Sequence, residues 1–249
     1  MSNRLYSIYK NVMNFVKLLW FFNGIILIYI FYFSKKKWIH YILIPWYEYP
    51  IAVRLWTSDV PTFSQIFCHN DYEFPYWKNP QWMIDAWANV WYAALRFRKH
   101  YPNLRIICIE PEESNYNLLR ENVWRYEDIF CIKGWLWNRK TYLKIIDTKA
   151  EKWGFELCES DTQTDIQWYS IEDIISQYKI NSIDIVKIDI EWSEKEVFEK
   201  NTERIEKSNT IVIETHERMR KWSHATVIKR MENWNCSRCW ENIVFTPII

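Results

Sequence analysis

The feature that most constrains the fold is an alternation that begins near residue 51. Short apolar runs rich in Ile and Val alternate there with segments whose apolar residues recur at helical spacing. We expect strands over 51–55, 83–85, 105–109, 129–133, 183–190 (the longest) and 210–213, and helices over 90–100, 114–126, 171–178 and 225–233. Strands separated by helices pair in parallel through right-handed crossovers. The pattern therefore predicts an α/β fold with a doubly wound, mostly parallel sheet.

Two of the expected helices carry a start signal. Ser170 and Asp173 precede and open the helix at 171–178 with the spacing of a capping box, and Ser193 and Glu196 have the same spacing after the run 183–190.

The first 49 residues differ from the rest of the chain. Residues 18–33 form an apolar run, interrupted by Asn23 and Gly24 and followed by three lysines. The run is shorter than the roughly 20 residues of a spanning helix, basic residues flank both of its ends, and no small-residue cleavage site follows it. We expect residues 1–49 to form an apolar helical segment and residues 50–249 to form the functional domain. The segment packs on the domain or lies on a membrane surface, with a true anchor as the alternative, so we expect a cytoplasmic protein whose membrane association stays open.

Charge and cysteine content exclude several classes of protein. Lys and Arg number 32 against 31 Asp and Glu, a net charge of +1, which excludes a globally basic nucleic-acid-binding protein. We therefore expect no nucleic-acid partner. Cys236 and Cys239 form a single CxxC pair, which is half of a zinc site, and two thiols near a hairpin are the simpler interpretation. No metal is expected.

The ends of the first two sheet strands suggest a nucleotide-like ligand. In such sheets the ligand lies beyond the carboxyl ends of the strands. The run 83–85 is followed by Ala86, Trp87, Ala88 and Asn89, and the run 105–109 by Glu110 and Pro111. An acidic residue at the end of the second strand can accept both hydroxyls of a ribose.

The turn after the first strand lacks the glycines that such a site needs. Backbone must approach the ligand closely there, and some positions need a positive φ. The chain has only 3 glycines but 17 tryptophans, whereas ordinary usage of about 7% would give roughly 17 glycines. Trp87 and Trp91 stand where glycine is expected, although an indole would fill the ligand space and a positive φ is costly for a bulky residue.

The ordered motifs resemble the FkbM-type methyltransferases, a branch of the class I fold that uses S-adenosylmethionine (SAM). The matching pieces are RLWTSDVPTFSQIF (54–67), IDAWANVWYAAL (84–95), IICIEPEESNYNLLREN (106–122), KGWLWN (133–138), WGFEL (153–157), SIEDII (170–175), IDIVKIDIEWSEKEVF (183–198), IVIETHER (211–218) and ENIVF (241–245). Tryptophan stands where the family has glycine at positions 56, 87, 91 and 192, and we extend this interpretation to 222 and 240 and then to 46 and 168. Trp137 and Trp153 stand where the family itself has tryptophan.

Replacement of one residue type by one other at so many sites suggests a wrong genetic code. Some bacterial lineages read the codon UGA as glycine, whereas another code reads it as tryptophan. Richness in Ile, Lys, Asn and Tyr fits the AT-rich coding in which UGA is frequent. We hypothesise that the cellular protein carries glycine at most of these positions. The alternative is a diverged protein with literal tryptophans and a damaged cofactor loop.

The resemblance implies SAM as the cofactor and methylation of a hydroxyl, on a sugar or glycan-type acceptor. The cofactor-binding residues that it implies are Asp85, Ala86, Trp87, Ala88, Asn89, Glu110, Pro111 and Ser58. Asp85 and Asn89 would contact the methionine end of SAM, and Glu110 its ribose. The simpler alternatives are a turn Asp with a capping Asn, and a surface Glu. Thr57, Ser58 and Asp59 would close over the site or form a local polar turn.

The catalytic residues expected are Asp189 and His216. Lys187, Asp189 and Glu191 alternate along one expected strand and so share a face, and we expect Lys187 and Glu191 to bind the substrate. Asp189 would stabilise the sulfonium or accept the proton of the acceptor hydroxyl, and His216 is the other candidate base. A strand-end cluster of salt bridges and a solvated loop histidine are the alternatives. Trp137 and Trp153 line the pocket or simply pack.

Two other functions stay open. With literal tryptophans the fold would serve as a pseudoenzyme or binding module. An NAD(P)-dependent oxidoreductase shares the strand, turn, helix and acidic residue, but its G-x-G-x-x-G loop is not matched even with glycine at 87 and 91.

Overall fold

The computed structural model describes residues 13, 14, 18, 24, 27–31, 38–69, 72, 79–138, 142–145, 157–160, 167–190, 194–199, 202–216 and 222–248. The strands are β1 (Ile39–Ile42), β2 (Ile51–Arg54), β3 (Trp82–Ala86), β4 (Arg105–Glu110), β5 (Ile129–Lys133), β6 (Trp135–Leu136), β7 (Tyr142–Ile145), β8 (Leu157–Ser160), β9 (Trp168–Tyr169), β10 (Ile185–Ile188), β11 (Thr210–Glu214), β12 (Trp234–Cys239) and β13 (Asn242–Pro247). The helices are α3 (Asp59–Phe63), the π-helical η1 (Ser64–Cys68), α4 (Tyr92–His100), α5 (Glu113–Val123), α6 (Ile171–Tyr178), α7 (Glu194–Glu199) and α8 (Ser223–Arg230).

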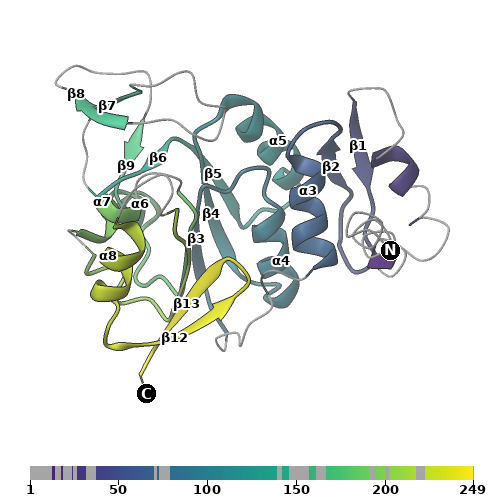
Figure 1. Cartoon of the computed structure of the whole chain (residues 1–249). Helices are drawn as coiled ribbons and strands as arrows, with labels where there is room; N and C mark the ends of the chain where they lie inside the picture. Colours follow the sequence, from purple (N-terminus) through teal and green to yellow (C-terminus); the bar gives the residue numbers. More distant parts are fainter. Residues whose placement is uncertain are drawn as a thin grey trace.

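A seven-stranded sheet forms the centre of the molecule, with the strand order β12-β13-β11-β10-β3-β4-β5 (Figure 1). Strands β5, β4, β3, β10 and β11 pair in parallel, and β13 pairs antiparallel with both β11 and β12. The chain runs outward from β3 to β5 and then returns to lie on the other side of β3. This confirms the predicted doubly wound, mostly parallel sheet and places its switch point between β3 and β10.

The apolar runs form strands because the sheet is covered on both faces. Figure 1 shows α4 and α5 on one side of it and α6, α7 and α8 on the other. One apolar cluster joins the inner faces of α4 and α5 to β2 and α3, and a second joins α6, α7 and α8 to the opposite face of the sheet.

Two sequence expectations need correction. The run 183–190 yields only the four-residue strand β10, because its register with β3 and β11 covers Ile185–Ile188. The run 51–55 forms β2 outside the main sheet, in an antiparallel pair with β1.

The capping box expected at α6 is confirmed. Ser170 Oγ accepts the backbone N–H of Asp173 at 3.1 Å, and Asp173 Oδ2 accepts the backbone N–H of Ser170 at 2.9 Å. The box orients α6, whose apolar face covers the sheet. Ser193, expected to cap the next helix, lies outside the described residues.

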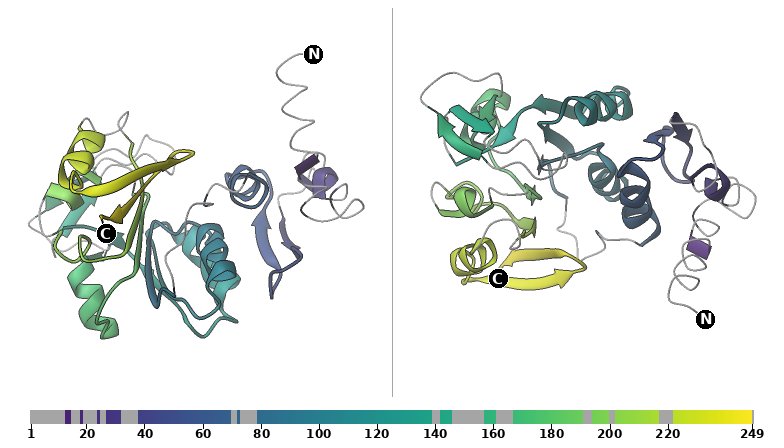
Figure 2. Two further views of the ribbon diagram at one scale, coloured as in Figure 1. Left: turned by 90° about the horizontal axis from the view of Figure 1, so that it is seen from below. Right: turned by 45° about the horizontal axis from the view of Figure 1, so that its top comes forward.

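The β1–β2 hairpin joins the N-terminal segment to the domain. β1 belongs to residues 1–49, and its partner β2 packs with α3 on the cluster that covers the sheet. Figure 2 shows the hairpin beside α3, away from the seven-stranded sheet. Within the described part of the chain, none of the helices has the length and apolar character that a bilayer-crossing segment requires.

Among the described residues, six tryptophans have a left-handed backbone. They are Trp46, Trp56, Trp87, Trp91, Trp222 and Trp240, with φ between 57° and 81°. All six belong to the set for which the sequence suggested glycine, whereas Trp168, also in that set, lies in β9. Trp192 lies outside the described residues. Positive φ is a genuine outlier for a bulky side chain but is freely adopted by glycine. The backbone at these turns therefore has a left-handed conformation that glycine adopts without strain.

Two exposed members of this group provide a stability test. Trp46 and Trp222 are 81% and 66% exposed and have φ of 76° and 71°. Because the left-handed conformation costs a residue with a Cβ roughly 1–2 kcal/mol, Trp46→Gly and Trp222→Gly should each raise the free energy of unfolding by about 1 kcal/mol, measured by urea denaturation. Trp124 is the matched control, since it is 68% exposed but has φ of −55°, and Trp124→Gly should lower stability. Equal loss of stability in all three variants would contradict the strain argument.

Candidate active site

The candidate site lies at the switch point of the sheet. Ala86 and Ile188 are register partners at the carboxyl ends of β3 and β10, where a doubly wound sheet binds its ligand. A cavity of about 200 Å³ opens there, and Trp87, Asn89, Lys187, Asp189 and His216 are among the residues that line it. The structure therefore brings together Trp87 and His216, which are 129 positions apart in the sequence.

The loop between β3 and α4 is tightly folded at this point. The backbone N–H groups of Trp87 and Ala88 both donate to the carbonyl of Ile109, at 2.9 Å each. Trp87, Asn89 and Trp91 alternate along the loop with φ of 69°, 51° and 81°. Asparagine tolerates this conformation, whereas tryptophan does not.

Of the two indoles of the loop, that of Trp87 is half-buried and that of Trp91 is buried. The Trp87 ring packs edge-on against Trp135 at 4.8 Å between centroids. Trp91 is completely buried against Tyr126, at 5.1 Å between ring centroids, and its side chain interacts with the buried thiol of Cys108. A thiol is a weak acceptor, so Trp91 combines a strained backbone with a weak partner for its buried indole N–H.

Glu110, at the end of β4, faces this loop and is completely buried. Its Oε2 accepts the backbone N–H of Asn89 at 2.8 Å, and its Oε1 accepts that of Glu112 at 3.0 Å. Burial raises its pKa to about 7 although these hydrogen bonds oppose the shift. Pro111 follows directly and turns the chain toward α5. The predicted carboxylate thus lies beside the loop, held by two backbone amides.

Asp85 and Lys187 form a buried pair between the two central strands. Lys187 Nζ lies 3.0 Å from Asp85 Oδ1 and 3.7 Å from Asp189 Oδ2, and it donates to the carbonyl of Trp87 at 3.4 Å. Burial raises the pKa of Asp85, which the charge of Lys187 partly offsets. Asp85, expected to contact the cofactor, is therefore oriented toward Lys187, and Lys187 contacts the cofactor loop as well as lining the cavity.

Asp189 and His216 meet at the mouth of the cavity. His216 Nε2 lies 3.7 Å from Asp189 Oδ1 and 3.4 Å from Glu214 Oε1. On the other side of the ring, Nδ1 lies 2.5 Å from Glu194 Oε1. Neither Glu194 nor Glu214 was among the site residues expected from the sequence. Glu191, the other expected substrate-binding residue, lies outside the described residues.

Their environment separates the protonation states of these groups. Burial would lower the pKa of His216, but its bonds to Glu194 and Glu214 and the nearby carboxylates raise it to about 11. Burial raises the pKa of Asp189 to about 7, against the attraction of Lys187. The bond to His216 lowers the pKa of Glu214 despite its burial. At neutral pH the imidazole is thus a cation, while Asp189 is close to its titration midpoint.

Asp189, Glu214 and His216 could each offer one ligand atom to a metal, since these atoms lie within 4.8 Å of one another. The sequence analysis expected no metal. In the structure the imidazolium lies between the two carboxylates, and Lys187 approaches Asp189 from the other side. We therefore interpret the cluster as an ion-pair network.

The segment Thr57–Asp59 has a local and a long-range role. Thr57 Oγ1 bonds within the turn, to Arg54 and Asp59, as the simpler alternative expected. Buried Asp59 binds the Arg54 guanidinium at 2.8 Å, and Arg54 reaches Asn115 of α5 at 2.6 Å. Ser58 is exposed and precedes α3. It does not line the cavity, whereas Thr62 and Gln65 farther along α3 and η1 do.

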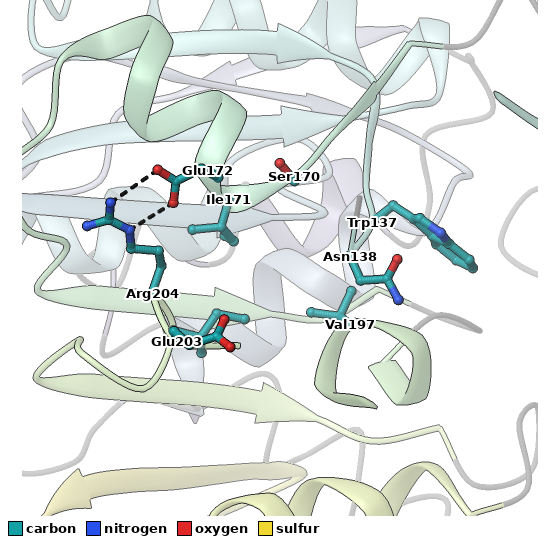
Figure 3. A pocket seen from close by; sticks show the side chains of 9 residues that line it. Trp137, Asn138, Ser170, Ile171, Glu172, Val197, Glu203 and Arg204 are labelled. Carbon is teal, nitrogen blue, oxygen red and sulfur yellow. Dashed lines mark hydrogen bonds and ion pairs between the residues drawn. The ribbon is translucent and has the colours of Figure 1, made fainter. Parts of the chain in front are cut away.

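A second cavity, of about 300 Å³, lies between α6 and α7 (Figure 3). The ion pair of Glu172 and Arg204, at 2.8 Å, lies along it. Trp137 also lines it but is 8% exposed and packs against Trp168 at 5.9 Å, so it is mainly core material. Trp153 lies outside the described residues.

Similarity to known protein families shows to which family the chain belongs. The methyltransferase FkbM domain matches residues 76–237, well over half of the chain. The chain belongs to the FkbM methyltransferase family. No curated protein sequence matches it. The FkbM family is one of methyltransferases, and the cofactor that it implies is S-adenosylmethionine.

Three solved structures are similar to this chain. An FkbM methyltransferase from Methylobacillus flagellatus KT matches with a TM-score of 0.50 and 15% identity, over 74% of this chain and 47% of that one. The present chain therefore spans about half the length of that protein. A Geobacter sulfurreducens methyltransferase matches at 0.44 and 12%, over 76% and 88% of the two chains. Aeropyrum pernix fibrillarin with bound S-adenosyl-L-methionine matches at 0.41 and 11%, over 71% and 70%.

The polar groups of the site fit SAM, whereas one side chain does not. The carboxylate of Glu110 suits a ribose, and the left-handed loop beside it suits close approach of backbone to ligand. The indole of Trp87 projects from the same loop. A glycine at this position would remove the conflict.

Glu110 provides a direct test of the cofactor position. In the chain with glycine at positions 87 and 91, Glu110→Gln should weaken SAM binding by roughly 10- to 100-fold, because a hydrogen bond to a charged group contributes about 1.5–3 kcal/mol. Isothermal titration calorimetry measures the Kd. Glu113→Gln is the control, since this residue is close in sequence but exposed and paired with Lys133. An unchanged Kd in Glu110→Gln would place the ribose elsewhere.

Proposed function

We propose that this FkbM methyltransferase transfers the methyl group of SAM to a hydroxyl of a sugar or glycan-type acceptor. One observation carries the proposal: the Asp189 carboxylate lies at the switch point, on the cavity beside the cofactor loop, between Lys187 and His216. A base is useful there because a neutral hydroxyl is a poor nucleophile. The FkbM family supports the methyl donor, and the position of the carboxylate supports the hydroxyl acceptor.

Asp189 is the better candidate for the base. A protonated His216 has no free lone pair on Nε2, whereas a carboxylate with a pKa of about 7 is ionised in a large fraction of molecules at neutral pH. Bound SAM would supply the methyl group to the acceptor oxygen, with the electron pair of the C–S bond left on sulfur, and Asp189 would accept the hydroxyl proton. His216 and Lys187 stabilise the carboxylate before it takes up this proton.

The cavity has the polar character of a site for a hydroxylated acceptor. Thr62 and Gln65 line one part of it and Glu241 and Asn242 another. These side chains offer both donors and acceptors to hydroxyl groups. Holding such an acceptor in line with the methyl donor would supply most of the rate.

We propose further that the cellular protein has glycine at positions 46, 56, 87, 91, 222 and 240. Support comes from two independent directions: the family motifs have glycine at positions 56, 87 and 91, and the backbone at all six positions is left-handed. The pseudoenzyme alternative requires that the strained tryptophans be literal. Codons decide between them, since UGA at these positions with UGG at Trp137 supports glycine, and UGG throughout contradicts it.

SAM binding tests this proposal on the protein. The chain with Trp87→Gly and Trp91→Gly should bind SAM saturably in isothermal titration calorimetry, whereas the tryptophan chain should bind at least 100-fold more weakly, because an indole occupies the loop. Trp46→Gly is the control, because it makes the same change far along the chain from the loop. Trp82→Gly is unsuitable because Trp82 lies within β3. If the double variant binds NADH rather than SAM, the oxidoreductase alternative gains support and the methyltransferase assignment fails.

Turnover tests the role of Asp189. In the glycine-containing chain, Asp189→Asn should lower formation of S-adenosylhomocysteine by roughly 10²–10⁴-fold and leave the SAM Kd within a few-fold. Because the base must be ionised, the activity of the glycine-containing chain with Asp189 intact should rise with pH through about 7. His216→Ala should also lower turnover, through loss of the neighbouring cation. Mass spectrometry with a panel of monosaccharide and glycan acceptors measures the product, and full activity of Asp189→Asn would remove it from the reaction.

The N-terminal segment supports a proposal about location. We propose that residues 18–33 and the adjoining hairpin contact a membrane surface, which would suit a membrane-linked glycan precursor as acceptor. Tyr29, Trp38, Tyr41 and Leu43 are each at least 60% exposed, and aromatic side chains favour the membrane interface. Co-sedimentation with anionic lipid vesicles tests this contact, and recovery of the full chain in the supernatant would contradict it.

A further inference from the structure

Glu194 is a buried carboxylate that the reaction as described does not use. It is the first residue of α7, and its side chain is completely inaccessible to solvent. Its Oε2 has no hydrogen-bond partner among the described residues. A buried carboxylate is costly unless it is paired, so the partner of its other oxygen explains why it is tolerated.

That partner is His216, through two separate groups. Glu194 Oε1 accepts the backbone N–H of His216 at 3.2 Å and lies 2.5 Å from Nδ1 of the ring. One oxygen thus binds the backbone and the side chain of the same residue. This geometry fixes the imidazole relative to the end of β11, because rotation of the ring would break the Nδ1 bond while the backbone bond remains.

With Nδ1 engaged, only Nε2 faces the cavity. Its neighbours are Glu214 Oε1 at 3.4 Å and Asp189 Oδ1 at 3.7 Å. A ring that faces carboxylates through both nitrogens is stabilised when both nitrogens carry protons. The ring then presents an N–H, not a lone pair, to Asp189.

We propose that Glu194 is a positioning residue that keeps the imidazole of His216 protonated and directs its Nε2–H toward Asp189 and Glu214. The inference rests on the proposed function for the role of Asp189 as base. It assigns to α7 a part in catalysis that the sequence did not indicate. A cation held in this place stabilises the ionised form of Asp189, which is the form that can take up the proton.

The charged groups that face His216 come from three described elements. Glu194 approaches from α7, Glu214 from β11 and Asp189 from the end of β10, and Lys187 of β10 lies behind Asp189. Lys187 acts on Asp189 rather than on the ring. Removing the charge of Glu194 therefore leaves the other charges in place and isolates its contribution.

NMR titration of the full-length chain, labelled with ¹⁵N-histidine, tests the assignment without any acceptor. The signals of His216 are assigned through His216→Gln. In the wild type the imidazole should stay doubly protonated above pH 8. In Glu194→Gln, whose amide oxygen can still accept from Nδ1, the titration midpoint should fall by ~1–3 pH units, the usual effect of losing an opposite charge at this distance.

One control and a second variant complete the design. Glu172→Gln removes a carboxylate from the first turn of α6, where it is exposed and paired with Arg204, and it should leave the His216 midpoint unchanged. Glu194→Asp should restore part of the shift. If Glu194→Gln fails to fold, the wild-type titration still decides: a midpoint near the ordinary value of about 6.5 overturns the proposal, as does an unchanged midpoint in a folded variant.

Turnover of the glycine-containing chain separates this inference from the proposed function. Glu194→Gln should lower the rate at least tenfold and leave the SAM Kd unchanged, with partial rescue by Glu194→Asp. If the glycine-containing chain with Glu194 intact makes no methylated product but the NMR shift is present, the proposed function fails and the positioning of His216 stands. If turnover is normal in Glu194→Gln, the catalytic part of the inference is overturned.

Discussion

A single buried ammonium group holds the candidate site together. Lys187 lies on β10, directly beside β3 at the switch point, and contacts Asp85 within the sheet, the carbonyl of Trp87 in the cofactor loop and Asp189 on the cavity. A buried ion pair adds little net stability over an apolar pair, but loss of one partner costs roughly 3–5 kcal/mol because the other charge is left uncompensated. Lys187 is therefore best understood as a residue that fixes geometry: it ties the loop and the base to the same two strands.

The loop shows a conflict between side chain and backbone. Its hydrogen bonds to Ile109 and to Glu110 need a succession of left-handed residues, and Asn89 is the one of the three whose side chain suits that conformation. The same mismatch recurs at exposed turns outside this loop, at Trp46, Trp56, Trp222 and Trp240. Strain at an active site can serve a function, but strain at several separate turns with the same residue type needs a common cause. A change in the meaning of one codon supplies such a cause.

Much of the fold was predictable because its signals are local. Buried strands appear as apolar runs, and the capping box of α6 appears as Ser170 and Asp173 at fixed spacing. Asp189 and Glu110 could be placed because each follows a strand at the edge where ligands bind. Glu194 could not be placed from the sequence, because its bond to His216 spans 22 positions and depends on how α7 packs beside β11. The one available signal was an acidic residue in the first turn of the helix after β10. The spacing of Ser193 and Glu196 indicated a capping box and gave Glu194 no role.

The roles of Asp189 and His216 follow from this long-range packing and not from their residue types. Histidine is the usual base near neutral pH because its ordinary pKa lies there, and a sequence argument alone gives it that role as readily as it gives it to Asp189. Three carboxylates from different elements surround His216 and favour its cationic form, while burial shifts Asp189 toward neutral pH. When the pKa values of neighbouring groups are shifted apart in this way, the group whose pKa approaches the working pH is suited to exchange protons. The other group keeps a fixed charge. The fold therefore exchanges the roles that the two side chains would have in water.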